Sequence, residues 1–220
     1  MNFSYDFDAA IFDMDGTLLD TMRYWRFTTL EFLLAHQLPV KNEDLVRMLD
    51  TSSRKLLYDI AERDGIEIGD KKTVVTELED YMGRHYQYDS YPKDEHVRAF
   101  LQKLKDSGIR MCVATGSRRE HARTGLGRAG LLDYFEFVTD NYEADNGITK
   151  AEPEYFFQTA ARLGVAPERC VVFEDACYAM EAAKKAGCRV LAIEDQTARM
   201  QKEKIVEVAD WYIKSYAELL

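Results

Sequence analysis

The chain has 220 residues, 46% of them hydrophobic, and 39 acidic against 29 basic residues give it a formal net charge of −10. This length suits one large domain or a domain with a sizeable insert, and the acidic balance argues against a nucleic-acid-binding protein, which needs a basic face. No apolar run is long enough to span a bilayer, and the N-terminal residues lack the pattern of a signal peptide. We therefore expect a cytoplasmic protein that binds neither nucleic acid nor membranes.

The segment AAIFDMDGTLLD, residues 9–20, begins with an apolar run that predicts a buried strand at Ala9–Phe12. Asp13 and Asp15 follow this run directly, with a Gly-Thr pair behind them. Burying a carboxylate is costly, and two like charges side by side raise that cost. The acidic pair therefore needs a compensating positive charge.

Residues 18–90 contain no convincing strand, and they predict a helical subdomain that is inserted after the first strand. Pro92 marks the position where we expect the chain to return from this helical insert to the main domain. The predicted domains are an α/β core formed by residues 1–17 and 91–220 and a helical cap formed by residues 18–90.

Helical spacing of apolar residues predicts the helices of this cap. We expect one helix after Met22, one capped at Asn42, one that begins after Ser52 and Ser53 and stops near Gly65, and one after Asp70. Their expected apolar positions are Phe27, Leu30 and Leu34, then Leu45, Val46 and Leu49, then Leu56, Leu57 and Ile60, and last Val74, Leu78, Tyr81 and His85.

Further apolar runs predict strands at Arg110–Ala114, Phe137–Thr139, Cys170–Phe173, Arg189–Ile193 and Trp211–Ile213. Helix-like stretches lie between the later runs, one with Pro153 near its start and one closed by Gly187. Strands that alternate with helices predict an α/β fold, here a Rossmann-like, doubly wound parallel sheet with helices on both faces.

Polar residues follow three of these later strands. Thr115, Gly116 and Ser117 come after the second strand, Lys150 lies on the loop after the third, and Glu174 and Asp175 follow the fourth. Ligands of an open parallel sheet bind beyond the carboxyl ends of its strands. We therefore expect these side chains to converge with Asp13 and Asp15 at one rim of the sheet.

This set of residues points to phosphate chemistry assisted by a metal. A hard cation such as Mg²⁺ neutralises clustered carboxylates and accepts oxygen ligands. Lys150 adds a positive charge, and the Thr115 hydroxyl and nearby backbone amides add donors for phosphate oxygens. A phosphoryl group needs such screening before a carboxylate can attack it.

The stretch DMDGTLLD resembles the first motif of the haloacid dehalogenase superfamily, and Thr115, Lys150 and the FEDA stretch resemble its second, third and fourth motifs. The helical insert is similar to the small helical cap of this superfamily, and the chain looks most like its β-phosphoglucomutase-like phosphatases and phosphohexomutases. The stretch after the lysine reads Ala151-Glu152-Pro153 where the family has Pro-x-Pro. We expect the loop to persist, because the lysine and the later proline remain.

The resemblance implies a role for each matching residue. Asp13 would attack phosphorus and form an aspartyl-phosphate, and Asp15 would act as general acid and then as general base. Mg²⁺ would be held by the Asp13 carboxylate, the Asp15 backbone carbonyl and Asp175, with Glu174 nearby or ligating. Thr115 and Lys150 would bind the transferred phosphoryl group. Further substrate contacts are expected from Gly16, Thr17, Gly116, Ser117, Arg54 and Arg118.

The sequence predicts a phosphatase of a small phosphorylated metabolite, with a sugar phosphate as the expected class, in a monomer or small homo-oligomer. A phosphohexomutase is the alternative, since Arg54 and Arg118 fall where that branch holds the non-reacting phosphate of its substrate. Trp25 stands where the mutases carry a histidine, and Thr51 replaces a glycine of their cap loop. A non-catalytic binding protein of the same fold is a remote alternative.

One motif is interpreted as a decoy. GLGRAG, residues 125–130, matches the Gly-x-Gly-x-x-Gly dinucleotide fingerprint, which works only directly after a strand. Ten residues of charged, helix-like sequence separate it from the nearest predicted strand. These glycines are expected at the fraying end of a helix.

Overall fold

The computed structural model describes residues 3–48, 51–141 and 148–220. A six-stranded, all-parallel sheet has the order β3-β2-β1-β4-β5-β6. The strands are β1 (Ala9–Phe12), β2 (Arg110–Ala114), β3 (Val138–Thr139), β4 (Cys170–Glu174), β5 (Arg189–Ile193) and β6 (Trp211–Ile213). The predicted strands are confirmed, except that β3 begins one residue later than expected and β4 ends one residue later.

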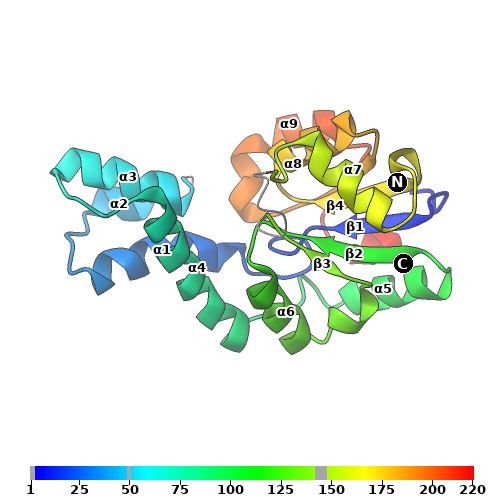
Figure 1. The fold of residues 1–220 in the computed structure, drawn as a ribbon, viewed down its shortest axis with the longest axis horizontal. Helices are drawn as coiled ribbons and strands as arrows, with labels where there is room; N and C mark the ends of the chain where they lie inside the picture. The colour runs from blue at the N-terminus through cyan, green and yellow to red at the C-terminus, as the bar shows by residue number, and fades with distance from the viewer. Residues whose placement is uncertain (1–2, 49–50, 142–147) are drawn as a thin grey trace.

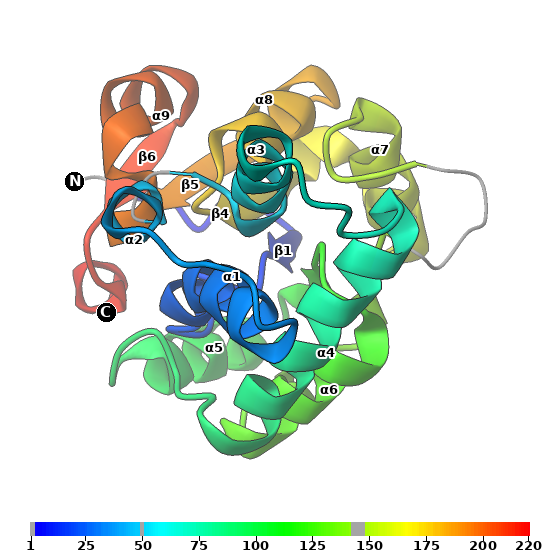
Figure 2. The same ribbon diagram turned by 90° about the vertical axis from the view of Figure 1, so that its left-hand side faces the viewer.

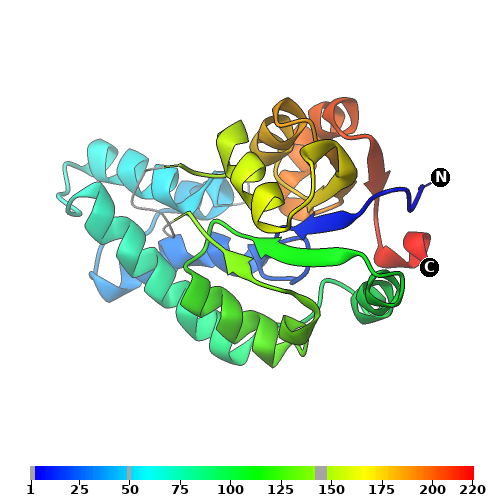
Figure 3. The ribbon, with the colours of Figure 1, turned by 45° about the vertical axis from the view of Figure 1, so that its right-hand side comes forward.

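Helices cover both faces of the sheet, as Figures 1 and 3 show. One face packs against α5 (Val97–Asp106) and α6 (Arg119–Arg128), and the other against α7 (Pro153–Arg162), α8 (Cys177–Lys185) and α9 (Lys202–Val208). The predicted doubly wound α/β fold is therefore confirmed. In the described part of the chain, no helix has both the length and the apolar composition that a membrane crossing requires.

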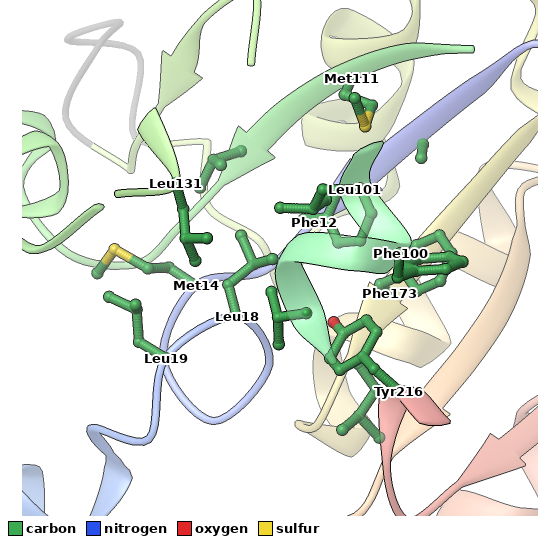
Figure 4. Packing of buried hydrophobic residues seen from close by; sticks show 14 of the residues in the cluster. Phe12, Met14, Leu18, Leu19, Phe100, Leu101, Met111, Leu131, Phe173 and Tyr216 are labelled. Carbon is green, nitrogen blue, oxygen red and sulfur yellow. The ribbon is translucent and has the colours of Figure 1, made fainter. Parts of the chain in front are cut away.

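The alternation of side chains along the strands explains the two layers. Ala9 and Ile11 of β1 point to the α7 and α8 side, whereas Ala10 and Phe12 point to the α5 side. Phe12 stacks on Phe173 of the neighbouring strand with ring centroids 4.4 Å apart. Both belong to the packed layer of buried side chains in Figure 4. This tightly packed layer fixes the end of β1, from which the acidic pair emerges.

The cap consists of α1 (Met22–Ala35), α2 (Asn42–Arg47), α3 (Ser53–Asp64) and α4 (Lys71–Tyr88), at the left of Figure 1. Asp70 caps α4 by accepting a hydrogen bond from the Thr73 amide, and Gly65 ends α3 in the left-handed conformation, as expected. The two connecting segments run side by side, because the Lys93 amide donates to the Leu18 carbonyl at 2.8 Å. A separate cluster of buried residues holds the cap together: Phe32, Leu33, Met48, Leu56, Leu57, Ile60, Val74, Leu78 and Tyr81.

The predicted apolar face of α1 is wrong at Phe27 and Leu34, whereas Leu30 packs against the buried cluster of the cap as expected. Phe27 and Leu34 are 53% and 62% exposed, whereas Thr28, Thr29, Phe32 and Leu33 are buried. Helix α1 turns this second face toward α3 and α4. Two threonines take buried positions there, and the Thr28 hydroxyl donates to the Trp25 carbonyl. Strongly apolar residues thus lie on both sides of the helix, and their spacing alone does not identify the buried face.

The prediction for α2 is wrong in two respects. The helix begins at Asn42 and Lys41 is its N-cap, with the Asp44 carboxylate accepting from the Lys41 amide at 3.0 Å. Leu45 and Val46 are exposed, while Asp44 is buried against Arg63 at 2.6 Å. An ion pair thus anchors this short helix where an apolar face was expected. Leu49 lies outside the described residues.

Helix α4 spans the cap and the core. Val74, Leu78 and Tyr81 belong to the cap cluster, whereas Met82 and Tyr86 pack in the cluster beneath the sheet. Figure 1 shows α4 descending from the cap to lie along α6.

Two glycines permit this close approach of α4 and α6. A Cβ at Gly83 would lie 2.9 Å from the His121 ring, and a Cβ at Gly125 would lie 3.0 Å from the Tyr86 ring. Gly125 and Gly127 lie within α6, and Gly125 is buried. The expectation of a fraying helix end is therefore wrong at Gly125, because this glycine is a packing contact.

Candidate active site

A cavity of about 530 Å³ lies between the carboxyl ends of the strands and the cap helices. Figure 2, viewed from the cap side, shows α1 and α3 in front of the sheet. The core residues that line the cavity include Asp13, Asp15, Gly116, Ser117, Asn141, Glu174 and Asp175. The cap residues that line it include Trp25, Arg26, Arg54 and Glu79. The predicted acidic residues are thus brought together at one rim.

Asp13 emerges from β1 into a buried position beside Lys150. The Lys150 ammonium donates to Asp13 Oδ1 at 2.6 Å and lies 2.7 Å from Glu174 Oε2. Asp13 Oδ2 is buried and has no hydrogen-bond partner among the described residues. Burial, followed by the charge of Glu174, raises the pKa of Asp13 to about 8, against the lowering effect of Lys150. Burial alone would lower the pKa of Lys150, but the charges of Asp13 and Glu174 outweigh it and raise that pKa well above its usual range.

The acidic cluster fits a hard divalent cation. Asp13, Glu174 and Asp175 each offer a carboxylate oxygen, and these oxygens lie within 4.8 Å of one another. Burial raises the pKa of Asp175 well above its usual range, and the charges of Asp13 and Glu174 add to the effect. An all-oxygen set in which Asp13 Oδ2 is buried without a hydrogen-bond or ion-pair partner among the described residues matches the ligand preference of Mg²⁺. Glu174 already accepts hydrogen bonds within the protein, because its Oε1 accepts from the backbone amides of Asp175 and Ala176.

Gly16 allows the first motif to approach the fourth. Its φ is +87°, and a Cβ there would lie 2.4 Å from Asp175 Oδ2 and 2.7 Å from Met22 Cγ. A side chain at this position would strain the backbone and occupy the space of the Asp175 carboxylate.

The Asp15 side chain is surrounded by hydrogen-bond donors. Thr21 Oγ1 donates to its Oδ1 at 2.5 Å, the Tyr86 hydroxyl lies 2.8 Å from both oxygens, and Ser117 Oγ donates to Oδ2 at 2.9 Å. Burial raises the pKa of Asp15, while the hydrogen bonds from Thr21, Tyr86, Ser117 and Trp25 oppose that rise. Trp25, like Asp15, lines the cavity.

Two members of this network were missed by sequence reasoning. Thr21 lies in the connection to the cap, and no motif marks it. Tyr86 follows Met82 by one helical turn of α4, which is a core pattern that gives no hint of a hydroxyl contact 71 residues away in the chain.

The predicted phosphate-binding residues are divided between the cavity wall and the layer behind it. Gly116 and Ser117 line the cavity, whereas Thr115 is fully buried and its hydroxyl accepts from the Ser117 amide at 3.1 Å. Thr17 is also fully buried. Glu152 accepts from the amide and the hydroxyl of Thr149, and so closes the loop that carries Lys150.

The two predicted arginines lie in different surroundings. Arg54 is exposed at the start of α3 and lines the cavity. Arg118 is not part of the lining: its Nε lies 2.7 Å from Glu79 Oε2 and its Nη1 3.4 Å from Asp80 Oδ1, both on α4. Arg26 ties cap to core, because its guanidinium donates to the carbonyls of Met48 and Thr197.

Comparisons with known proteins place this geometry in a family. A model of the haloacid dehalogenase-like hydrolases matches residues 7–187. The phosphorylated carbohydrates phosphatase of Thermotoga maritima is 30% identical over 187 residues, which cover 82% of each chain. The β-phosphoglucomutase of Bacillus subtilis is 29% identical over 184 residues, covering 81% of this chain and 80% of the relative.

The solved structures agree on the fold. A haloacid dehalogenase-like protein of Agrobacterium tumefaciens superposes with a TM-score of 0.76 at 22% identity, covering 97% of this chain and 96% of the other. The prediction of a phosphoric monoester hydrolase of this superfamily is confirmed by these comparisons. The chain belongs to the haloacid dehalogenase-like hydrolases.

Proposed function

We propose that the protein is a Mg²⁺-dependent phosphatase that hydrolyses a small phosphorylated metabolite, of the sugar phosphate class, through an aspartyl-phosphate on Asp13. The observation that carries this proposal is the position of Asp13. One of its oxygens is held by Lys150, and the other is buried without a hydrogen-bond partner among the described residues, beside Glu174 and Asp175. The relative named a phosphorylated carbohydrates phosphatase supports the substrate class.

Two steps complete the reaction. An Asp13 oxygen forms a bond to phosphorus while the bond from phosphorus to the metabolite oxygen breaks, and Asp15 donates a proton to that leaving oxygen. In the second step a water oxygen forms a bond to the phosphorus of the aspartyl-phosphate while the bond from phosphorus to the Asp13 oxygen breaks, and a proton of the water passes to Asp15. Inorganic phosphate leaves, and both aspartates return to their starting states.

The metal would be held by the carboxylates of Asp13 and Asp175 and the backbone carbonyl of Asp15, with Glu174 supporting or ligating. When bound, Mg²⁺ supplies positive charge that screens the anionic phosphoryl group from the carboxylates. Lys150 adds charge on the other side of Asp13, and the amides and hydroxyls around Gly116 and Ser117 orient the phosphoryl oxygens.

The cap supports the reaction by enclosing it. Arg26 links α1 to the core segment at Thr197, and α4 carries Tyr86 to Asp15. A closed cavity excludes bulk water during the first transfer, so that the leaving group departs before hydrolysis begins.

A phosphohexomutase is the second candidate. Arg54 in the cavity wall and the relative named β-phosphoglucomutase favour it. Trp25 in the cavity wall argues for the phosphatase, because the resemblance places a histidine of the mutases at that position. Incubation with β-glucose 1-phosphate and a bisphosphate activator separates the two, since a mutase produces an isomer without releasing phosphate.

The proposal is tested with a panel of phosphorylated sugars, polyols and nucleotides assayed for phosphate release in Mg²⁺ and in EDTA. Asp13→Asn and Asp15→Asn should each reduce turnover by on the order of 10³-fold or more. Asp106→Asn, on the exposed side of α5, serves as the matched control. Robust hydrolysis by the Asp13 variant would refute the mechanism, and no phosphate release from any compound would favour a non-catalytic protein.

A further inference from the structure

We propose that Glu79 selects substrates with a single phosphate and an uncharged, hydroxyl-bearing remainder, and that it rejects those with a second phosphate. This inference rests on the proposed phosphatase function and assigns the substrate class of the same site. It concerns the cap wall of the cavity, away from the acidic cluster.

Glu79 brings a buried acidic side chain to the cavity wall from α4. The residue is 4% exposed and lines the cavity beside Val75 and Leu78 of the same helix. A carboxylate among apolar neighbours is costly to bury unless a cation accompanies it. Arg118 supplies that cation, with its Nε 2.7 Å from Glu79 Oε2.

The ion pair determines which charge faces the substrate. Arg118 follows the Thr115-Gly116-Ser117 stretch and is not part of the cavity lining, whereas Glu79 is. Asp80, whose side chain is 60% exposed, lies 3.4 Å from the same guanidinium and holds it from the solvent side. On α4 the cavity wall therefore carries an acidic residue, whereas Arg118, which was expected to bind the non-reacting phosphate of a substrate, lies outside the lining.

Two cap arginines also line the cavity: Arg26, which donates to the carbonyls of Met48 and Thr197, and Arg54. Arg54 lines the cavity as a donor, while Glu79 is an acceptor. A hydroxyl group can donate to the carboxylate and accept from the guanidinium, so a polyol or sugar satisfies both residues. A second phosphate only accepts hydrogen bonds, and its charge would be repelled by Glu79.

The test compares fructose 1-phosphate with fructose 1,6-bisphosphate as substrates of the full chain in Mg²⁺. Glu79→Gln removes the negative charge at nearly constant volume and frees Arg118 from its strongest partner. We expect kcat/KM for the bisphosphate, relative to that for the monophosphate, to rise at least about tenfold, which corresponds to about 1.4 kcal/mol.

Two matched variants isolate the charge. Asp80→Asn removes the second carboxylate near Arg118, and Asp80 lies outside the cavity. The ratio of kcat/KM for the bisphosphate to that for the monophosphate should change less than about threefold in this variant. Glu79→Asp keeps the charge and should preserve most of the discrimination. Thermal melting of each variant shows whether it is folded.

The outcomes distinguish the two proposals. If the wild type releases phosphate from fructose 1-phosphate or p-nitrophenyl phosphate but the ratio is unchanged in Glu79→Gln, the role of Glu79 is refuted and the phosphatase function stands. An equal rise of this ratio in Asp80→Asn would also refute the role of Glu79, because removing any negative charge near Arg118 would then have the same effect. A wild type that hydrolyses neither compound overturns both.

Discussion

The hydroxyl of Tyr86, on cap helix α4, lies 2.8 Å from each carboxylate oxygen of Asp15, on the loop that follows β1. Both residues are buried, and Ser117 Oγ lies 2.9 Å from the same hydroxyl. The proposed general acid and base is therefore oriented by a residue of the cap as well as by the core.

Tyr86→Phe should reduce kcat about tenfold, because a hydrogen bond to a charged, buried carboxylate is lost. The Tyr86 hydroxyl lowers the pKa of Asp15, so its removal should move the limb of the pH–rate profile that requires ionised Asp15 to higher pH. Steady-state kinetics between pH 5 and 9 on a phosphate monoester measure both effects. Tyr81→Phe is the control, because the Tyr81 hydroxyl on the same helix donates to Glu77 and Tyr81 does not line the cavity. An unshifted profile in Tyr86→Phe would contradict the assignment.

Mg²⁺ should raise the melting temperature relative to EDTA, since an ion that binds only the folded state stabilises it. At a concentration 100-fold above its dissociation constant the gain is about 2.7 kcal/mol. Asp175→Asn should abolish most of this shift, whereas Asp106→Asn should retain it. Equal shifts in the two variants would exclude Asp175 as a ligand.

The same shift should grow as the pH rises from 6 to 9. Burial raises the pKa of Asp13 to about 8 and that of Asp175 well above its usual range, so the metal-free folded state retains protons that the unfolded state has lost. The metal-free protein should therefore lose stability as the pH rises from about 4 towards 8. Mg²⁺ must displace these protons, so it should stabilise the protein most at alkaline pH. Melting curves in EDTA and in Mg²⁺ across this range measure both trends, and a constant difference would contradict the pKa directions.

Gly16→Ala should destabilise the protein and weaken metal binding. A residue with a side chain costs roughly 1–2 kcal/mol at this positive φ, and the new Cβ would also collide with Asp175 Oδ2. Gly108→Ala has a similar φ of +72° but open space around the position, so it should show the backbone cost alone. Urea unfolding in EDTA and in Mg²⁺ compares the two; equal losses, with equal Mg²⁺ stabilisation, would show that the Asp175 contact does not matter.

Lys93→Met should cost roughly 3 kcal/mol at neutral pH, because it leaves Asp195 buried without its ion-pair partner. Burial opposes the ionisation of Asp195, yet Lys93 outweighs it and holds the pKa of Asp195 below its usual value. The pair therefore stabilises the fold above the unfolded pKa of about 4, and this contribution disappears as the pH falls through the lower folded value. Urea unfolding should show a difference from wild type that narrows in acid. Lys202→Met, which breaks an exposed pair with Glu194, should cost less than about 1 kcal/mol at any pH.

The sheet and its rim could be predicted from the sequence because their signals are local. Short β-branched runs define the strands, and parallel strands place whatever follows them at the same edge, so Asp13 and Asp175 could be expected to meet although 162 positions apart in number. The buried faces of the cap helices were harder to predict. Buried threonines of α1 and the Asp44–Arg63 ion pair occupy positions where apolar residues were expected.

The contacts between cap and core could not be predicted. Tyr86 with Asp15 and Glu79 with Arg118 join segments that have no common motif, and each depends on where α4 lies against α6. That placement depends on Gly83 and Gly125, which leave room for the two helices to approach each other. In a sequence, glycines inside a helix indicate only weak helix formation and do not indicate a contact between helices.

Because α4 belongs to two buried clusters, the cap is not an interchangeable module. In a chimera that replaces residues 18–90 with those of a relative, the relative's last cap helix would pack against His121 and Gly125. A bulkier residue at that contact would move the hydroxyl that corresponds to Tyr86 away from Asp15. Grafting new specificity onto this scaffold therefore requires exchanging the inner half of α4 together with the facing surface of α6.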